Sequence, residues 1–171
     1  MKQEGTSATP ASKSKLLLGL NIATLAFGLD RICKWWLLDF VDMPSRLHIS
    51  LMPFFDLVMV WNKGISFGLF SNSGLGHKWL LSAVSIVIVS VLIFWLQRTH
   101  DRLSALAFGL IIGGAVGNIY DRIAYGAVAD FFDFHIGGYH WPAFNIADSA
   151  ITIGVVLILL EAFLTREEPQ Q

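Results

Sequence analysis

Four apolar stretches, separated by polar segments, divide the chain. They cover residues 16–38, 79–96, 103–120 and 146–164. A transmembrane helix needs about 20 predominantly apolar residues to cross the hydrocarbon core of a bilayer. The pattern therefore predicts an all-α membrane protein with four transmembrane helices, whose two ends lie on the same side of the membrane. We expect residues 1–171 to form a single multi-pass domain.

Composition supports a membrane protein and excludes some partners. Hydrophobic residues make up 54% of the chain and charged residues 15%, against roughly 25% charged in an ordinary soluble domain. The mean hydropathy is +0.59. A formal net charge of -1 argues against nucleic acid as a partner, and no obligatory protein partner is evident. The single cysteine excludes an internal disulfide.

The amino-terminal segment, residues 1–15, is polar and rich in serine and threonine, and we expect a disordered cytoplasmic tail. It also fits the n-region of a signal peptide. Against that alternative, the apolar run continues through Trp35 and Trp36 without a small-residue cleavage site, which favours an uncleaved first helix. The two tryptophans are typical of an aromatic belt at the membrane surface.

Basic residues predict the orientation. The tail and the turn between the second and third spans carry a group that the positive-inside rule places in the cytoplasm: Lys2, Lys13, Lys15, Arg98 and Arg102. The opposite side carries Arg46, Lys63, Lys78 and Arg122. Segments 39–78 and 121–145 then lie on the outer face. In the first of them, the runs RLHISL and DLVMVW predict a small β-rich element, and we expect the second to be a loop.

Two aspartates, Asp130 and Asp148, lie in apolar surroundings at this same outer face. Charge is costly there and calls for a function. Two adjacent carboxyl groups cannot both ionise, so they share a proton and can activate a water. The ionised group would act as general base, while the protonated one polarises the scissile carbonyl and protonates the leaving amine. This chemistry is that of an intramembrane aspartic peptidase, and it requires no metal or organic cofactor.

The third apolar stretch ends in GGAVGNIYDR. Gly113 and Gly117 are four residues apart, a spacing that lets another helix approach closely. Asn118 and Arg122 follow at the same spacing. Polar groups at this depth need partners or a substrate to bind.

Two further pairs lie near helix ends. Asn145 is suited to cap the fourth helix, which would leave Asp148 in its first turn, where the helix dipole favours the ionised carboxylate. We therefore expect Asp148 to be the more readily ionised member of the pair. Asp30 and Lys34 are one turn apart, in the favourable order for a structural ion pair.

Five motifs occur in order along the chain: DRICK at 30–34, NKGISFG at 62–68, GGAVGNIYDR at 113–122, VADF at 128–131 and FNIADSAI at 144–151. Together they resemble the lipoprotein signal peptidases, the signal peptidase II family. The resemblance implies an enzyme of the bacterial cytoplasmic (inner) membrane, with both termini cytoplasmic and its active site towards the periplasmic face. It further implies that the enzyme cleaves prolipoproteins directly before a diacylglyceryl-modified cysteine, with membrane lipids as partners.

By this resemblance the catalytic residues are Asp130 and Asp148. The residues that line or support the substrate site would be Asn62, Gly64, Asn118, Arg122 and Asn145, with Asp30 and Lys34 as scaffold. The chain departs from the family pattern in two places. Ser66 stands where the family usually has alanine, and Cys33 where threonine is common. Neither departure affects the aspartate pair.

Other hydrolase chemistries fit the residues less well. Residues 64–68 spell the GxSxG string of serine hydrolases, which needs a strand-turn-helix setting together with a histidine and an acid. The five histidines include no HExxH motif of a zinc peptidase, and we expect His135 and His140 in a loop. Cys33 is a lone thiol more typical of packing than of a nucleophile.

Two non-hydrolase functions are alternatives for buried carboxylates, a proton relay in a small transporter and a non-catalytic assembly factor. A transporter should carry polar residues near the middle of its spans. Here the span 79–96 offers only serines, and the polar groups gather at the outer ends. An assembly factor has no need for two aspartates flanked by Asn118, Arg122 and Asn145. The pattern favours the peptidase.

Overall fold

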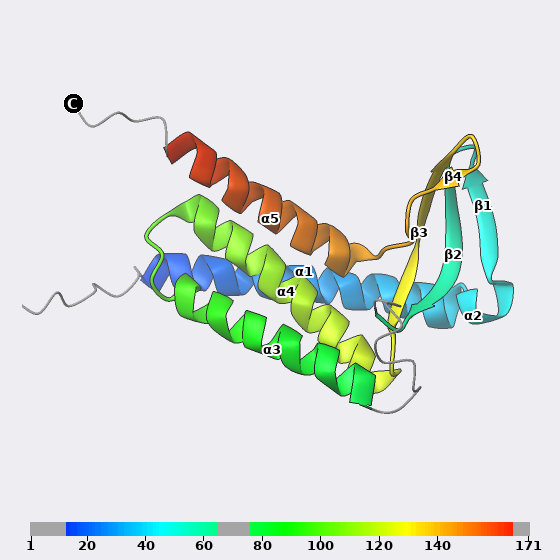
Figure 1. Ribbon diagram of the computed structural model, residues 1–171, viewed down its shortest axis with the longest axis horizontal. Helices are drawn as coiled ribbons and strands as arrows, with labels where there is room; N and C mark the ends of the chain where they lie inside the picture. The colour runs from blue at the N-terminus through cyan, green and yellow to red at the C-terminus, as the bar shows by residue number, and fades with distance from the viewer. Residues whose placement is uncertain (1–12, 65–75, 166–171) are drawn as a thin grey trace, which may run out of the picture.

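The computed structural model describes residues 13–64 and 76–165 (Figure 1). Its long helices are α1 (Lys13–Trp35), α3 (Gly76–Leu96), α4 (Arg102–Ala124) and α5 (Ile146–Thr165). In the described part of the chain, these are four helices long and apolar enough to cross a membrane. The four predicted spans are confirmed. Residues 13–15 form the first turn of α1 and not the end of a tail, and residues 1–12 lie outside the described part.

The first helix leads directly into the outer segment. It continues as the five-residue π-helix η1 (Trp36–Phe40) and is followed by the short helix α2 (Met43–Arg46). Asp42 and Leu47 flank α2 with φ angles of 57° and 65°, a left-handed backbone that is uncommon for residues other than glycine. These two residues turn the chain from the membrane helix into the sheet.

Helix α4 is the centre of the bundle and packs against α1, α3 and α5. Its glycines allow this, because a Cβ atom at Gly113 would collide with the Ala23 carbonyl of α1, and one at Gly114 with the Ala147 carbonyl of α5. The predicted close approach is confirmed, and it involves two neighbouring helices. The surrounding core is apolar and consists of Ala23, Leu92, Leu96, Ala105, Ile111 and Ile112.

A four-stranded antiparallel sheet lies across one end of the bundle, where α1 and α4 end and α5 begins (Figure 1). Its strands, in spatial order, are β1 (His48–Met52), β2 (Phe55–Asn62), β3 (Val128–Ile136) and β4 (Tyr139–His140). The first two confirm the predicted β-rich element. The loop predicted over residues 121–145 is wrong, because that segment contains β3 and β4. His135 and His140, expected in a loop, are paired across these two strands.

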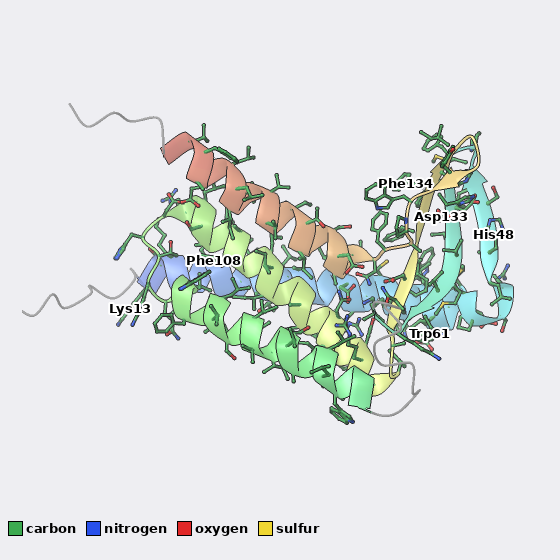
Figure 2. The ribbon with its side chains drawn as sticks, viewed as in Figure 1. Lys13, His48, Trp61, Phe108, Asp133 and Phe134 are labelled. Atoms are coloured by element: carbon green, nitrogen blue, oxygen red, sulfur yellow. The ribbon has the colours of Figure 1, made fainter. Side chains whose placement is uncertain are left out.

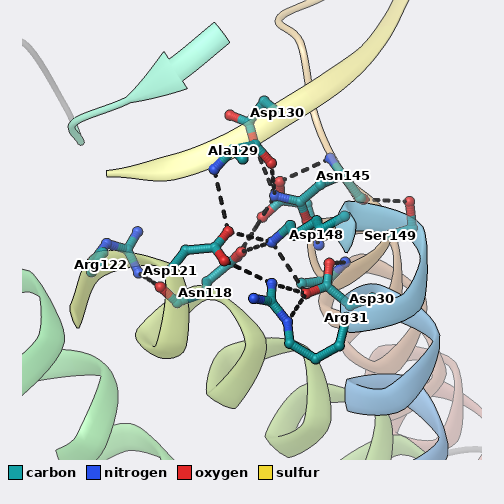
Figure 3. A network of polar contacts seen from close by, with 12 residues as sticks. Asp30, Arg31, Asn118, Asp121, Arg122, Ala129, Asp130, Asn145, Asp148 and Ser149 are labelled. Carbon is teal, nitrogen blue, oxygen red and sulfur yellow. Dashed lines mark hydrogen bonds and ion pairs between the residues drawn. The ribbon is translucent and has the colours of Figure 1, made fainter. Parts of the chain in front are cut away.

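Strand β3 is fixed to the end of the bundle by its buried side chains. Ala129 and Phe131 pack in an apolar cluster with Leu37, Met43 and Leu57, against which Cys33 also packs. Successive side chains of a strand point to opposite faces, so Asp130 points away from this cluster. The strand thereby holds Asp130 beside the start of α5, as Figure 3 shows.

Candidate active site

Asp130 is buried on β3, with 1% of its surface exposed. Its two carboxyl oxygens accept hydrogen bonds from neutral amides. Asn62 Nδ2 donates to Oδ2 at 3.0 Å and Asn145 Nδ2 donates to Oδ1 at 2.7 Å. The donors come from β2 and from the residue preceding α5. The site therefore joins the sheet to the membrane helices.

Asp148 is half-buried in the first turn of α5. Its Oδ1 accepts from Asn118 Nδ2 at 2.8 Å, and its Oδ2 accepts from the Asn145 backbone N–H at 3.3 Å. Asn145 Oδ1 accepts in turn from the Asp148 backbone N–H at 2.9 Å. This reciprocal pair is a capping box. The predicted cap by Asn145 is confirmed, but Asp148 is not free, because a residue three positions after the cap can bond back to it.

The environment of Asp130 favours its protonated form. Burial raises the pKa of Asp130 to about 6, and the negative charge of Asp148 adds to this rise. Hydrogen bonds from Asn62 and Asn145, together with the charge of Lys34, oppose it. Burial prevails because an ionised carboxylate loses more solvation than two amides return. Asp130 therefore keeps its proton to a higher pH than an ordinary aspartate.

Asn118 connects the two aspartates to α1. Beyond its bond to Asp148, its Oδ1 accepts from Asn145 Nδ2 at 3.3 Å and from Lys34 Nζ at 3.4 Å. Arg122, one turn later on α4, donates from Nη1 to the Asn118 carbonyl at 3.4 Å. The buried Nε of Arg122 has no hydrogen-bond partner among the described residues. One N–H of this guanidinium is thus available to a ligand beside the aspartates.

Gly64 sets the orientation of Asn62. Its backbone N–H donates to Asn62 Oδ1 at 2.9 Å, which leaves the NH₂ group of Asn62 to bond Asp130. Gly64 has a φ of 95°, a conformation that disfavours any side chain. The structure thus brings Asn62 into contact with Asp130, and Gly64 into contact with Asn62. Ser66, two positions later, lies outside the described residues.

The predicted ion pair between Asp30 and Lys34 is confirmed at 3.1 Å, but it is part of a larger cluster (Figure 3). Lys34 also binds Asp121 at 2.6 Å, and Arg31 joins the same group. Sequence reasoning missed both Asp121 and Arg31. A signal was present, since two more charged residues occur within the motifs DRICK and GGAVGNIYDR. Removing one partner of a buried ion pair costs about 3–5 kcal/mol, so the cluster holds α1 and α4 together.

The hydrogen bond from Asn62 yields a prediction about pH. It favours ionised Asp130, so the substitution Asn62→Ala should raise the pKa of Asp130 above about 6. If Asp130 must be protonated for catalysis, the rate falls as the pH rises through this pKa. We therefore expect the alkaline limb of the kcat profile to move to higher pH in Asn62→Ala, as measured with purified protein across a pH series.

Lys63→Gln is the matched control for this shift. Lys63 is the exposed neighbour of Asn62, where solvent screens its charge, so its profile should coincide with that of the unmodified protein. An alkaline limb that stays in place or moves to lower pH in Asn62→Ala would contradict this role of Asn62. The limb reports the coupled pair of aspartates rather than one residue alone.

Comparison with known proteins identifies the family. The family model for signal peptidase (SPase) II matches residues 22–164. A lipoprotein signal peptidase of Beijerinckia indica is 46% identical over 154 residues, which cover 90% of this chain and 92% of the relative. A lipoprotein signal peptidase of Vibrio cholerae is 38% identical and covers 95% of this chain and 96% of its own.

Solved structures agree. Two structures of a bacterial membrane enzyme each superpose with a TM-score of 0.74, at 25% and 27% sequence identity. They cover 96% and 91% of this chain, and 98% and 97% of their own. The family model and the relatives extend over all five motifs from Asp30 to Ile151. The chain therefore belongs to the signal peptidase II family, the lipoprotein signal peptidases.

Proposed function

We propose that Asp130 and Asp148 are the catalytic pair with which this signal peptidase II cleaves prolipoproteins. One observation carries the assignment: Asn145 donates its side-chain amide to Asp130 at 2.7 Å and forms the capping box with Asp148. A single residue thus holds two carboxyl groups that lie 18 positions apart in the sequence (148 − 130). Cleavage assays on Asp130→Asn and Asp148→Asn test this assignment, as argued in the Discussion.

The two environments support different roles for the two aspartates. Asp148, at the positive end of the α5 dipole, would accept a proton from water as the water attacks the carbonyl carbon. Asp130, with its raised pKa, would donate a hydrogen bond to the carbonyl oxygen and later its proton to the leaving amine. The free N–H of Arg122 is positioned to hold the peptide or a polar head group. Catalysis of this kind relies on positioning as well as on proton transfer.

The position of the site supports a lipidated substrate. Asp148 lies in the first turn of a helix long and apolar enough to span the membrane, so the two aspartates lie close to the bilayer surface. The acyl chains of a diacylglyceryl cysteine would hold the cleavage site at that depth, because lipid insertion contributes about 0.8 kcal/mol for each buried CH₂ group. We therefore take diacylglyceryl prolipoproteins as the substrates.

An aromatic groove supports membrane lipid as a further partner. Its lining includes Phe54, Phe134, Ile136, Tyr139, Trp141 and Phe144. Figure 2 shows Phe134 on the side of the sheet that faces the helices. Trp141 is 68% exposed and lies five positions before the start of α5 (146 − 141). Tryptophan and tyrosine favour the head-group region, so we assign this groove to lipids of the outer leaflet.

The distribution of basic residues supports the predicted orientation. Lys13 lies at the end of the bundle away from the sheet (Figure 2). Arg98 and Arg102 flank the turn between α3 and α4 at this same end. By the positive-inside rule this end faces the cytoplasm. The sheet and the two aspartates would then face the periplasm of a bacterium, with the chain in its inner membrane.

Cysteine labelling tests this orientation. In a Cys33→Ser background, which removes the only native cysteine, we expect Gly138→Cys to react with a membrane-impermeant thiol reagent in cells whose outer membrane has been permeabilised. Thr99→Cys should react only after the inner membrane is opened. Position 138 follows β3 and position 99 lies between α3 and α4, at opposite ends of the bundle. Labelling of both positions before the inner membrane is opened would contradict the orientation.

A further inference from the structure

Arg31 closes a ring with three buried charged residues, Asp30, Lys34 and Asp121, beneath the two aspartates (Figure 3). Its Nη2 lies 2.7 Å from Asp30 Oδ2 and 2.7 Å from Asp121 Oδ1. Lys34 Nζ joins the same two carboxylates at 3.1 Å and 2.6 Å. The contact between Arg31 and Asp121 is an ion pair outside hydrogen-bond geometry. Two cations thus balance two anions, and the ring has no net charge.

The ring holds the backbone next to each catalytic aspartate. Asp30 Oδ1 accepts from the Ala147 N–H at 3.1 Å, and Ala147 immediately precedes Asp148. Asp121 Oδ2 accepts from the Ala129 N–H at 3.2 Å, and Ala129 immediately precedes Asp130. The separation of the two carboxylates of the ring therefore sets the separation of the two elements that carry the catalytic pair.

The two cations of the ring are not equivalent. Lys34 is a compact charge that also contacts Asn118, whereas Arg31 presents a planar guanidinium. This guanidinium lies 4.6 Å from the ring centroid of Tyr120 and 6.0 Å from that of Phe27. Such contacts fix the plane of an arginine. Arg31 therefore has a defined orientation between α1 and α4, although its side chain remains 18% exposed.

We propose that Arg31 is a positioning residue for the peptidase reaction, which completes the ring that fixes the backbone at Ala129 and Ala147. The proposal rests on the assignment of Asp130 and Asp148 as the catalytic pair. Arg31 touches neither aspartate, and it acts through Asp30 and Asp121. Its loss should therefore change catalytic geometry more than substrate binding.

The balance of charge gives the proposal a second signature. Asp130 is faced by Asp148 from α5, by Lys34 from α1 and by Arg122 from α4. Without Arg31 the ring would carry one net negative charge close to this group. A nearby negative charge favours the protonated carboxyl group. The alkaline limb of the rate profile should then move to higher pH.

The experiment compares Arg31→Gln, Arg31→Lys and the unmodified protein, each as purified full-length enzyme acting on a diacylglyceryl prolipoprotein. For Arg31→Gln we expect kcat to fall about 10-fold to 100-fold, since small misplacements of catalytic groups have effects of this size. KM should change by less than about twofold, with the alkaline limb moved to higher pH. Arg31→Lys keeps the positive charge, so the alkaline limb of its rate profile should stay in place. Its kcat should lie between those of the unmodified enzyme and Arg31→Gln.

Arg98→Gln is the control, since Arg98 packs over Phe94 at the far end of the bundle and should leave kcat and the limb unchanged. An unchanged kcat in Arg31→Gln, or a lower kcat without a shift of the limb, overturns the proposal. If Arg31→Gln does not fold, Arg31→Lys decides, and a kcat equal to that of the unmodified enzyme overturns it. Asp130→Asn, assayed in parallel, separates the two claims. An active Asp130→Asn variant refutes the assignment of the catalytic pair. An inactive Asp130→Asn variant together with a fully active Arg31→Gln variant refutes only the role of Arg31.

Discussion

The substitutions Asp130→Asn and Asp148→Asn are each expected to lower the rate of prolipoprotein cleavage by at least about 100-fold. Each removes a group that transfers a proton, and general acid–base catalysis contributes about 10²-fold to 10⁴-fold. Asparagine keeps the size of the side chain and one acceptor oxygen, so the bonds from Asn118 and Asn145 can largely persist. Both variants should therefore fold. Initial cleavage rates and thermal melting curves of the purified variants provide the measurement.

Cys33→Ser is the matched control for this loss. Cys33 is a free, half-buried thiol on α1 that packs against the apolar cluster around Leu37 and Phe131. The Cys33→Ser variant should retain most of the activity. Ser66→Ala should also retain most of it. Near-normal cleavage by Asp130→Asn or Asp148→Asn would contradict the assignment. So would inactivation by a thiol-directed or serine-directed reagent acting at Cys33 or Ser66.

An unlipidated prolipoprotein is expected to be cleaved far more slowly than its diacylglyceryl form. The site lies at the end of the helix bundle, with Asp148 in the first turn of a membrane span. Acyl chains confine the substrate to this depth, and positioning of this kind can contribute several kcal/mol to the lowering of the barrier. Time courses of the two substrates in one detergent provide the measurement.

A substrate whose target cysteine is replaced by serine supplies the control for lipidation, since it cannot carry the thioether-linked lipid. It should behave like the unlipidated form. Equal rates for lipidated and unlipidated substrates would contradict the requirement for lipid. Such a result would leave a membrane peptidase that recognises its substrates by their sequence.

The membrane helices could be predicted from the sequence because length and apolarity alone decide whether a segment spans a bilayer. The ends of the helices do not follow from apolarity alone. Helix α4 extends to Ala124, four residues beyond the predicted end at 120, and contains the polar Asp121 and Arg122. Asp121 is neutralised by Arg31 and Lys34 from α1, and Arg122 donates to the Asn118 carbonyl one turn earlier in α4, so the helix continues where the hydrophobic pattern stops. A pattern within one segment contains no information about such partners.

The strand β3 could not be predicted for a related reason. Its sequence VADFFDFHI contains two aspartates, and acidic residues are depleted in strands. Asp133 is tolerated because His140 binds it at 2.7 Å, and Asp130 because Asn62 and Asn145 bind it. These partners come from β4, from β2 and from the start of α5. The strand is stabilised by contacts that form only in the folded chain.

The polar residues of the candidate site could be predicted by type, and their contacts only in part. The capping position of Asn145 and the one-turn spacing of Asp30 and Lys34 follow from helical geometry. The bond from Lys34 to Asp121 joins residues 87 positions apart, and no local spacing indicates it. Arg31 was missed because an i,i+1 neighbour of Asp30 is not expected to face the same partner on a helix. Arg31 nevertheless contacts Asp30 of its own helix and Asp121 of α4, because its side chain lies between α1 and α4.

Mass spectrometry of the cleavage products tests the catalytic pair and the scissile bond together. The purified enzyme and its Asp130→Asn variant would act side by side on one diacylglyceryl prolipoprotein. We predict a single cut directly before the lipidated cysteine by the unmodified enzyme and no product from the variant at equal protein concentration. A cut at another bond, or the same product from Asp130→Asn at a comparable rate, would contradict the account.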